Sequence, residues 1–296
     1  MIIVTIIKKV LSWLKDHTIG VILTALGIGA AAGTKGAVDA HKAKKINRQA
    51  LDIQQAALEK HEQAYQKTQQ VLTNLGEVEK SVIDSFVHFA DTMERIQGRP
   101  KMRATIFSSV KLPNYEPEEI KQFSTNVHMA IAGAGGIGAG VLAGLAAFGV
   151  GTLMAAPTIA GVGLVLCVKG HGLKRKAIKN KRQAKQMEKS VDEIIAFYAD
   201  IRKAADSFKE IISTVYHRYR IELKSVENTL TAKTTWKQFS REEKKSVENT
   251  VMLARLLYSM TQAKIVVRQD GKPEAINTDE IAKLQGQATK MLAGLS

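Results

Sequence analysis

The apolar positions of this chain follow a heptad-like spacing over two long stretches. In the second stretch they are separated by alternating intervals of four and three: Met187, Val191, Ile194, Tyr198, Ile201, Ala205, Phe208, Ile212, Val215 and Tyr219. Such a stripe is typical of a helix that packs along a partner helix. The first stretch, residues 38–97, has no proline and one glycine. We predict two long helices that pack antiparallel, with an intermolecular partner as the alternative.

Between these stretches lies a run without Asp, Glu, Lys or Arg, residues 127–168, in which glycine and alanine are frequent. Because a helix that crosses a bilayer needs about 20 apolar residues, the run predicts a hydrophobic membrane hairpin, with its turn at residues 148–151. Pro157 breaks or kinks the second pass, so partial insertion is the alternative.

The amino-terminal residues 1–34 predict another membrane segment. Lys8, Lys9 and Trp13 lie among large apolar residues, as in an amphipathic helix at a membrane interface. The following residues, 18–33, carry no charge. They form either an independent membrane segment or a continuation of the first helix.

Shorter elements complete the chain. Pro117 and the two acids after it indicate a helix start. Ser240 and Glu243 have capping-box spacing. Residues 264–267 and 274–276 flank a hairpin-type Asp270-Gly271 turn, which predicts a two-stranded ribbon. Thr278 is expected to cap the last helix.

These elements predict an all-α fold of long antiparallel coiled-coil-like helices, with a Gly/Ala-rich hydrophobic hairpin and a small β-ribbon near the C-terminus. The expected segments are an amino-terminal membrane segment (1–34), a long helix (35–98), a connector with a short helix (99–126), the membrane hairpin (127–168), a basic block with a long heptad helix (169–232), and carboxy-terminal helices with the ribbon (233–296).

The glycines of the apolar run admit two interpretations. Gly133, Gly135 and Gly138 match G-x-G-x-x-G, but a dinucleotide site also requires a βαβ unit and an acid about 20 residues further on, and residues 158–162 contain no acid. At helical spacing, small residues recur every fourth position, which allows helices to associate closely in lipid. We predict membrane helix packing through Ala25, Gly29, Gly33, Ala132, Gly136, Gly140 and Gly144. A merely compact hairpin is the alternative.

The charge of the chain favours anionic partners. Its 43 basic and 28 acidic residues give a formal net charge of +15. A basic block directly follows the apolar run, which is the pattern expected beside anionic lipid rather than nucleic acid; a solvated helix face is the alternative. With the amino-terminal Lys8, Lys9 and Trp13, the predicted headgroup-binding residues are Lys169, Lys174, Arg175, Lys176, Lys179, Lys181 and Arg182.

Catalytic chemistry has little support in the sequence. The single cysteine, Cys167, and the scattered histidines do not indicate a metal site. No nucleophile elbow or phosphate-binding lysine motif is present. We therefore expect a protein that is not an enzyme, without a catalytic, cofactor or metal site and without a small-molecule substrate.

The arrangement of long helices around an apolar hairpin resembles that of α-helical pore-forming toxins of the cytolysin A and haemolysin BL type. The resemblance is one of architecture and covers the whole chain. It implies that residues 127–168 correspond to the membrane tongue and residues 1–33 to the helix that lines the pore. Apolipoprotein L, with a glycine-rich hairpin between helices, is a looser parallel.

The sequence thus predicts a membrane-inserting helical protein that binds an anionic lipid membrane, forms a homo-oligomer through its glycine-rich helices and permeabilises the bilayer. The alternative is a non-enzymatic, membrane-anchored cytoplasmic coiled-coil scaffold or signalling protein. Either the helices lie on the cytoplasmic side of a membrane of the producing cell, or a soluble, secreted form converts to a membrane-bound one.

Overall fold

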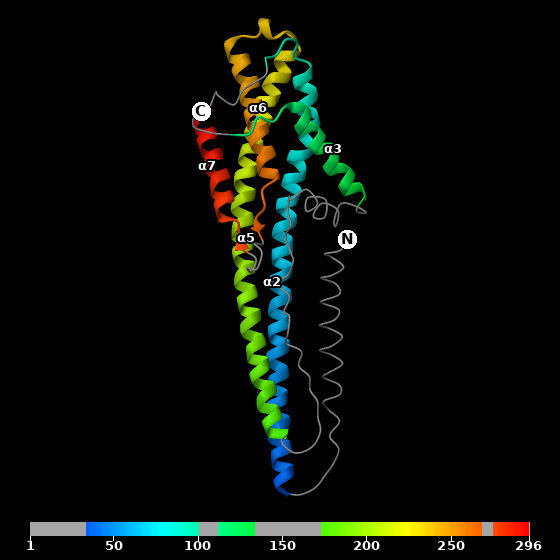
Figure 1. Cartoon of the computed structure of the whole chain (residues 1–296), viewed down its shortest axis with the longest axis vertical. Coiled ribbons are helices and arrows are strands. Elements are labelled where there is room, and N and C mark those ends of the chain that lie inside the picture. The colour runs from blue at the N-terminus through cyan, green and yellow to red at the C-terminus, as the bar shows by residue number, and fades with distance from the viewer. Residues whose placement is uncertain (1–33, 101–111, 134–172, 268–274, 296) are drawn as a thin grey trace. The chain divides into compact units, whose positions relative to one another are not determined.

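The computed structural model describes residues 34–100, 112–133, 173–267 and 275–295. Two long helices, α2 (Thr34–Glu94) and α5 (Leu173–Leu230), dominate these residues (Figure 1). Three shorter helices and one small antiparallel ribbon accompany them. The predicted all-α fold class and the carboxy-terminal ribbon are therefore confirmed. The predicted membrane hairpin lies outside the described residues beyond Gly133, and so do residues 1–33.

The chain divides into two compact units, and both long helices contribute to each. Unit 1 comprises residues 1–69 and 154–200, and unit 2 comprises residues 70–153 and 201–296. In the described part of the chain, unit 1 is the first part of α2 with the first part of α5. Unit 2 contains the later parts of these helices and all the shorter elements.

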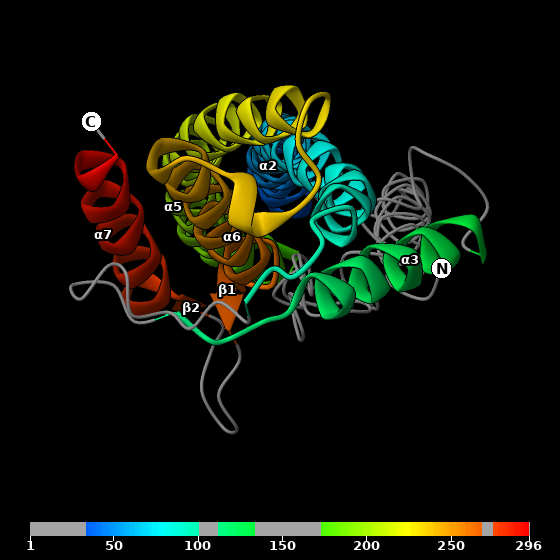
Figure 2. The same cartoon turned by 90° about the horizontal axis from the view of Figure 1, so that it is seen from above.

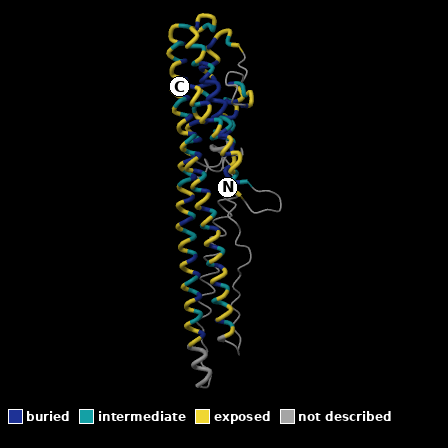
Figure 3. The backbone as a smooth tube through the Cα atoms, turned by 90° about the vertical axis from the view of Figure 1, so that its left-hand side faces the viewer, coloured by how far each residue is buried: buried dark blue, intermediate teal, exposed yellow. Residues whose placement is uncertain are grey.

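Unit 1 is held together by a seam of small side chains. Buried residues recur every seventh position, at Ala43, Ala50, Ala57 and Ala64 in α2 and at Ala177, Ala184, Val191 and Tyr198 in α5. Because alanine carries only a methyl group, the axes of the two helices can approach closely along this seam. The burial pattern in Figure 3 accordingly shows short buried stretches alternating with exposed ones along both helices.

The two long helices are parallel, so the predicted antiparallel pairing is wrong. In unit 1, the side chain of Asn180 donates to that of Asn47 at 3.1 Å, and the Tyr198 hydroxyl lies 3.5 Å from Nε2 of His61. Residue numbers therefore rise together along both helices. The heptad spacing is satisfied by either direction, and the 95–172 connection is long enough to return the chain to the start of its partner helix.

Unit 2 has the larger side chains and the thicker core. Here too α2 and α5 are parallel, because Tyr216 donates to the Ser81 carbonyl oxygen at 3.0 Å. Helix α6 (Arg241–Thr261) packs against them, and Figure 2 shows it between α3 (Pro117–Gly133) and α7 (Thr278–Gly294). The fully buried side chains include Phe86, Phe89, Phe208, Ile212, Tyr219, Leu253 and Leu257.

Helix α6 is the antiparallel partner of α5. The chain turns between Leu230 and Arg241 through a short 3-10 helix, η1 (Trp236–Gln238), and Ser246 of α6 then donates to Glu222 of α5 at 2.7 Å. The predicted capping box is confirmed. The Ser240 side chain accepts a hydrogen bond from the Glu243 backbone amide, and the Glu243 side chain accepts one from the Ser240 backbone amide. The sequence thus predicted where α6 starts, but it did not predict that α6 packs against α5.

The remaining predicted boundaries agree closely with the structure, with one correction. Pro117 is the first residue of α3, and the ribbon pairs β1 (Val266–Val267) with β2 (Ala275–Ile276). Thr278 was expected to cap the last helix, but Asn277 is the N-cap residue and Thr278 is already helical. Threonine and asparagine both favour this position, so composition alone did not distinguish these neighbours.

Candidate functional site

The parallel pairing brings the first turns of α2 and α5 to the same end of unit 1. We call this region the basic end. It comprises side chains of α2 that are exposed and side chains of α5 that are exposed or partly exposed. Its residues are Lys42, Lys44, Lys45 and Arg48 of α2, and Arg175, Lys176, Lys179, Lys181, Arg182 and Lys185 of α5.

Acidic residues are scarce around this end. The first turns of both helices contain no acid. Along α2, Asp39 is the only acid before Asp52, and along α5 the first acid is Glu188. The α2 residues of the basic end begin about two turns after the start of that helix. With few acids beside them, the basic side chains of the two helices create a concentrated positive field.

Two polar contacts fix how the two helices meet at and beside the basic end. Lys181 donates to the Gln49 side chain at 2.8 Å, next to the Asn180–Asn47 hydrogen bond. One apolar side chain, Ile178, is 40% exposed among the basic residues of α5. The basic end is thus a two-helix surface with a defined register.

The structure places part of the predicted headgroup set on this surface. Arg175, Lys176, Lys179, Lys181 and Arg182 belong to it, and Lys174 is a residue of α5. The predicted residues Lys8, Lys9, Trp13 and Lys169 lie outside the described residues.

The contribution of α2 to the basic end was missed from the sequence. The run of Lys42, Lys44, Lys45 and Arg48 is visible there, but it lies far from the α5 block along the chain. Only the parallel direction of the helices brings the two groups together. An antiparallel pairing, as predicted, places the start of α2 at the opposite end of α5.

The predicted helix-packing residues are mostly not described. Ala132 lies in the last turn of α3, whereas Ala25, Gly29, Gly33, Gly136, Gly140 and Gly144 lie outside the described residues. Among the residues that the structure does describe, no helix has the length and apolarity needed to cross a membrane.

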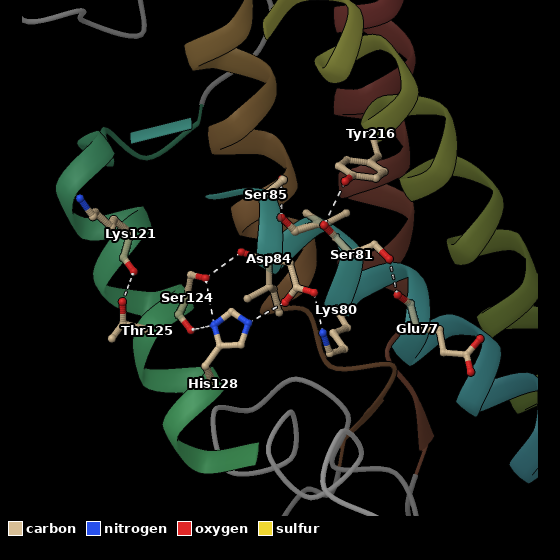
Figure 4. A network of polar contacts seen from close by, with 12 residues as sticks. Glu77, Lys80, Ser81, Asp84, Ser85, Lys121, Ser124, Thr125, His128 and Tyr216 are labelled. Atoms are coloured by element: carbon tan, nitrogen blue, oxygen red, sulfur yellow. Dashed lines mark hydrogen bonds and ion pairs between the residues drawn. The ribbon is translucent and has the colours of Figure 1, made fainter. Parts of the chain in front are cut away.

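Helix α3 carries the beginning of the apolar run and is held in unit 2 by polar contacts (Figure 4). Its Ser124 donates to the Ile83 carbonyl oxygen of α2 at 2.7 Å, and Nε2 of His128 lies 2.6 Å from the Asp84 carboxylate. Lys121 forms a further ion pair with Asp91, at 2.6 Å. Residues 127–133, the first part of the predicted hairpin, are helical as part of α3.

A buried arginine fixes the chain just before α3. Arg255 of α6 is fully buried, and its Nε donates to the Tyr115 carbonyl oxygen at 2.7 Å. Burial lowers its pKa, and Glu116, 3.7 Å away, opposes that shift. The ring of Tyr258 packs edge-on against those of Tyr115 and Phe123. No pattern in the sequence indicates that this arginine is internal, since arginine is usually exposed.

Two ionisable groups of α2 are shielded from water: Glu79 is buried and His61 is half-buried. Burial raises the pKa of Glu79, in unit 2, to about 8. In unit 1, burial lowers the pKa of His61, while the nearby Glu62 carboxylate partly offsets this effect. Both shifts arise from removing the charged form from water. The described residues contain no cluster of His, Cys, Asp and Glu that could hold a metal ion.

Comparison with known proteins gave no match to a family model, a curated protein or a solved structure. The arrangement of residues in this chain is therefore the basis for the proposals below.

Proposed function

We propose that the chain inserts its two apolar segments into an anionic bilayer, assembles into an oligomer through the small-residue positions of those segments, and permeabilises the membrane. One observation carries this proposal: the starts of α2 and α5 lie at the same end of unit 1. An uncharged apolar segment precedes each of these starts in the sequence, residues 18–33 before α2 and residues 127–168 before α5.

Two apolar segments joined to one end of the same unit can enter the same bilayer surface. The basic residues at that end are then beside the headgroups, where each is worth about 1 kcal/mol of attraction to anionic lipid. The glycine and alanine positions within the segments provide close-packing faces for association in lipid. These features together favour insertion and assembly over simple surface binding.

Dye release from liposomes that contain phosphatidylglycerol tests the proposal. The purified protein is expected to release the dye, and Ile137→Asp is expected to abolish release, because a carboxylate near the middle of a membrane helix costs about 2.5–3.5 kcal/mol. Ile137→Ala is the matched control and is expected to retain most of the release. Wild-type protein that binds the liposomes without releasing dye contradicts the proposal and leaves the membrane-anchored scaffold.

A further inference from the structure

We propose that the basic end is a single docking surface for the phosphate-bearing headgroups of anionic phospholipids, and that unit 1 meets the membrane with this end rather than with its side. The inference deepens the proposed function and rests on it, because it names the lipid class and the surface that recognises it.

The register combines two charge runs that are separate in the sequence. The α2 run, Lys42 to Arg48, and the α5 run, Arg175 to Lys185, flank the same contacts, Asn47 with Asn180 and Gln49 with Lys181. A field built from both runs is stronger than that of either helix alone. Neither first turn contains an acid that would offset this field. The field therefore attracts the negatively charged phosphate groups.

The charges surround the helix pair instead of lining one side. At about 100° per residue, Lys44 and Lys45 lie roughly 200° and 300° around α2 from Lys42. On α5, Lys176 and Lys181 lie roughly 100° and 240° around from Arg175. A helix that lies flat in an interface has its basic residues on one face and large apolar residues on the other. The distribution here favours end-on contact.

The length of the charged zone fits the depth of a headgroup layer. From Arg175 to Lys185 the helix rises about 15 Å. Each headgroup layer of a bilayer is about 5–8 Å thick, and the field of the anionic surface extends about 8 Å further at physiological salt. Acids return at Asp52 and Glu188, just beyond this zone. Ile178, partly exposed among the charges, supplies an apolar contact at the depth of the headgroups.

Vesicle flotation tests the contribution of α2. The variant carries Lys42→Gln, Lys44→Gln, Lys45→Gln and Arg48→Gln; these side chains are exposed, so helicity measured by circular dichroism is expected to remain. A control with the same loss of charge in unit 2 carries Lys237→Gln, Lys245→Gln, Lys283→Gln and Lys290→Gln, also at exposed positions. The α2 variant is expected to bind phosphatidylglycerol vesicles more than about tenfold more weakly than wild type, since each basic side chain near the surface contributes about fivefold.

The control is expected to bind within about twofold of wild type, because its charges lie outside the basic end. Equal weakening in both variants contradicts the inference and indicates a response to net charge alone. Unchanged binding of the α2 variant also contradicts it. Binding to a duplex DNA oligonucleotide that the α2 variant loses, while vesicle binding is kept, assigns the surface to nucleic acid and overturns the lipid assignment.

Fluorescent labels along one side of α5 test the end-on orientation. Single cysteines replace Ile178, Gln186 or Glu193 in a Cys167→Ser background. With spacings of eight and seven residues the labels lie within about 80° of one another around the helix while they span about 22 Å of its length. End-on contact predicts that the signal change on adding vesicles falls from 178 to 186 to 193. Equal changes at all three positions contradict end-on docking.

Flotation and dye release separate this inference from the proposed function. Vesicle binding that depends on α2, without dye release, supports the docking surface and contradicts permeabilisation. Dye release that the α2 variant retains, with unchanged flotation, supports permeabilisation and contradicts the docking surface.

Discussion

At the scale of single residues, Glu79 and His61 show how shielding from water changes the pH dependence of stability. Both residues occur in polar stretches of α2, where a charged or polar side chain is expected to face water. The structure instead places Glu79 inside unit 2 and His61 against Tyr198 in unit 1. Sequence periodicity did not identify either position as internal.

Glu79 makes the folded state less stable as the pH rises. Its ordinary pKa is 4.5 and its pKa in the protein is about 8, so between these values the folded state holds a proton that the unfolded state has lost. This contribution to stability is complete below pH 4.5 and is lost as the pH rises to about 8, with a slope approaching about 1.4 kcal/mol per pH unit.

Urea unfolding of Glu79→Gln at pH 5 and pH 8 measures this effect. The variant is expected to lose less stability than wild type over that interval, because glutamine does not ionise. Glu77→Gln, two residues away and exposed, is expected to behave as wild type. An identical pH dependence for Glu79→Gln and wild type contradicts the buried carboxyl.

His61 acts in the opposite direction. Because burial lowers its pKa below the ordinary value of 6.5, the unfolded state binds the proton more readily than the folded state. Its contribution to stability is present above pH 6.5 and is lost as the pH falls from 6.5 through the pKa of the folded state.

Thermal unfolding followed by circular dichroism at pH 7 and pH 5 is the measurement for His61. His61→Gln is expected to lose less stability on acidification than wild type, and His217→Gln, at an exposed position, is expected to match wild type. If both variants respond to acid as wild type does, His61 is not buried in its neutral form.

At the scale of the helices, the seam of unit 1 depends on small side chains. Ala184 is fully buried where α5 meets α2, whereas Ala199 on the same helix is exposed. Ala184→Leu is expected to destabilise the protein by about 1–3 kcal/mol through overpacking. Ala199→Leu is expected to change stability by less than about 0.5 kcal/mol. Equal values in chemical denaturation contradict a close helix approach at Ala184.

The direction of the helices has a direct chemical test. Asn47→Cys with Asn180→Cys, in a Cys167→Ser background, is expected to form a disulfide on mild oxidation, since the two asparagine side chains are in hydrogen-bond contact. Asn47→Cys with Glu193→Cys is expected to remain reduced, because Glu193 lies about 20 Å further along α5 from Asn180. Cross-linking of the second pair and not the first, seen as a gel shift, contradicts the parallel register.

The sequence predicted the positions of the long helices correctly and their relative direction incorrectly. Both outcomes have the same physical reason. The 4-3 spacing from Met187 to Tyr219 reports which side of α5 is buried, and residues 38–97 lack helix breakers. Neither pattern depends on whether the partner helix is parallel or antiparallel. Pro117, Ser240 and Asp270-Gly271 were informative because they act locally, through backbone geometry and caps. The α2 half of the basic end depended on the direction and was therefore missed.

At the scale of the whole molecule, the net charge of +15 is not spread evenly along the chain. Ten of the basic residues converge at one end of unit 1, next in sequence to the uncharged segments. The remaining helices of unit 2 contain acids interspersed with basic residues, which is typical of a surface that faces water. The molecule thus combines one strongly basic end with a second unit of mixed surface charge.

Electrical recording across a planar bilayer tests the central claim, permeabilisation, most directly. We predict that the wild-type protein, added to a bilayer containing phosphatidylglycerol, produces discrete conductance steps of a repeated size, because an oligomer of fixed stoichiometry forms a pore of fixed width. Ile137→Asp is expected to produce none. A bilayer that binds the wild-type protein and shows no conductance above the protein-free baseline contradicts the account.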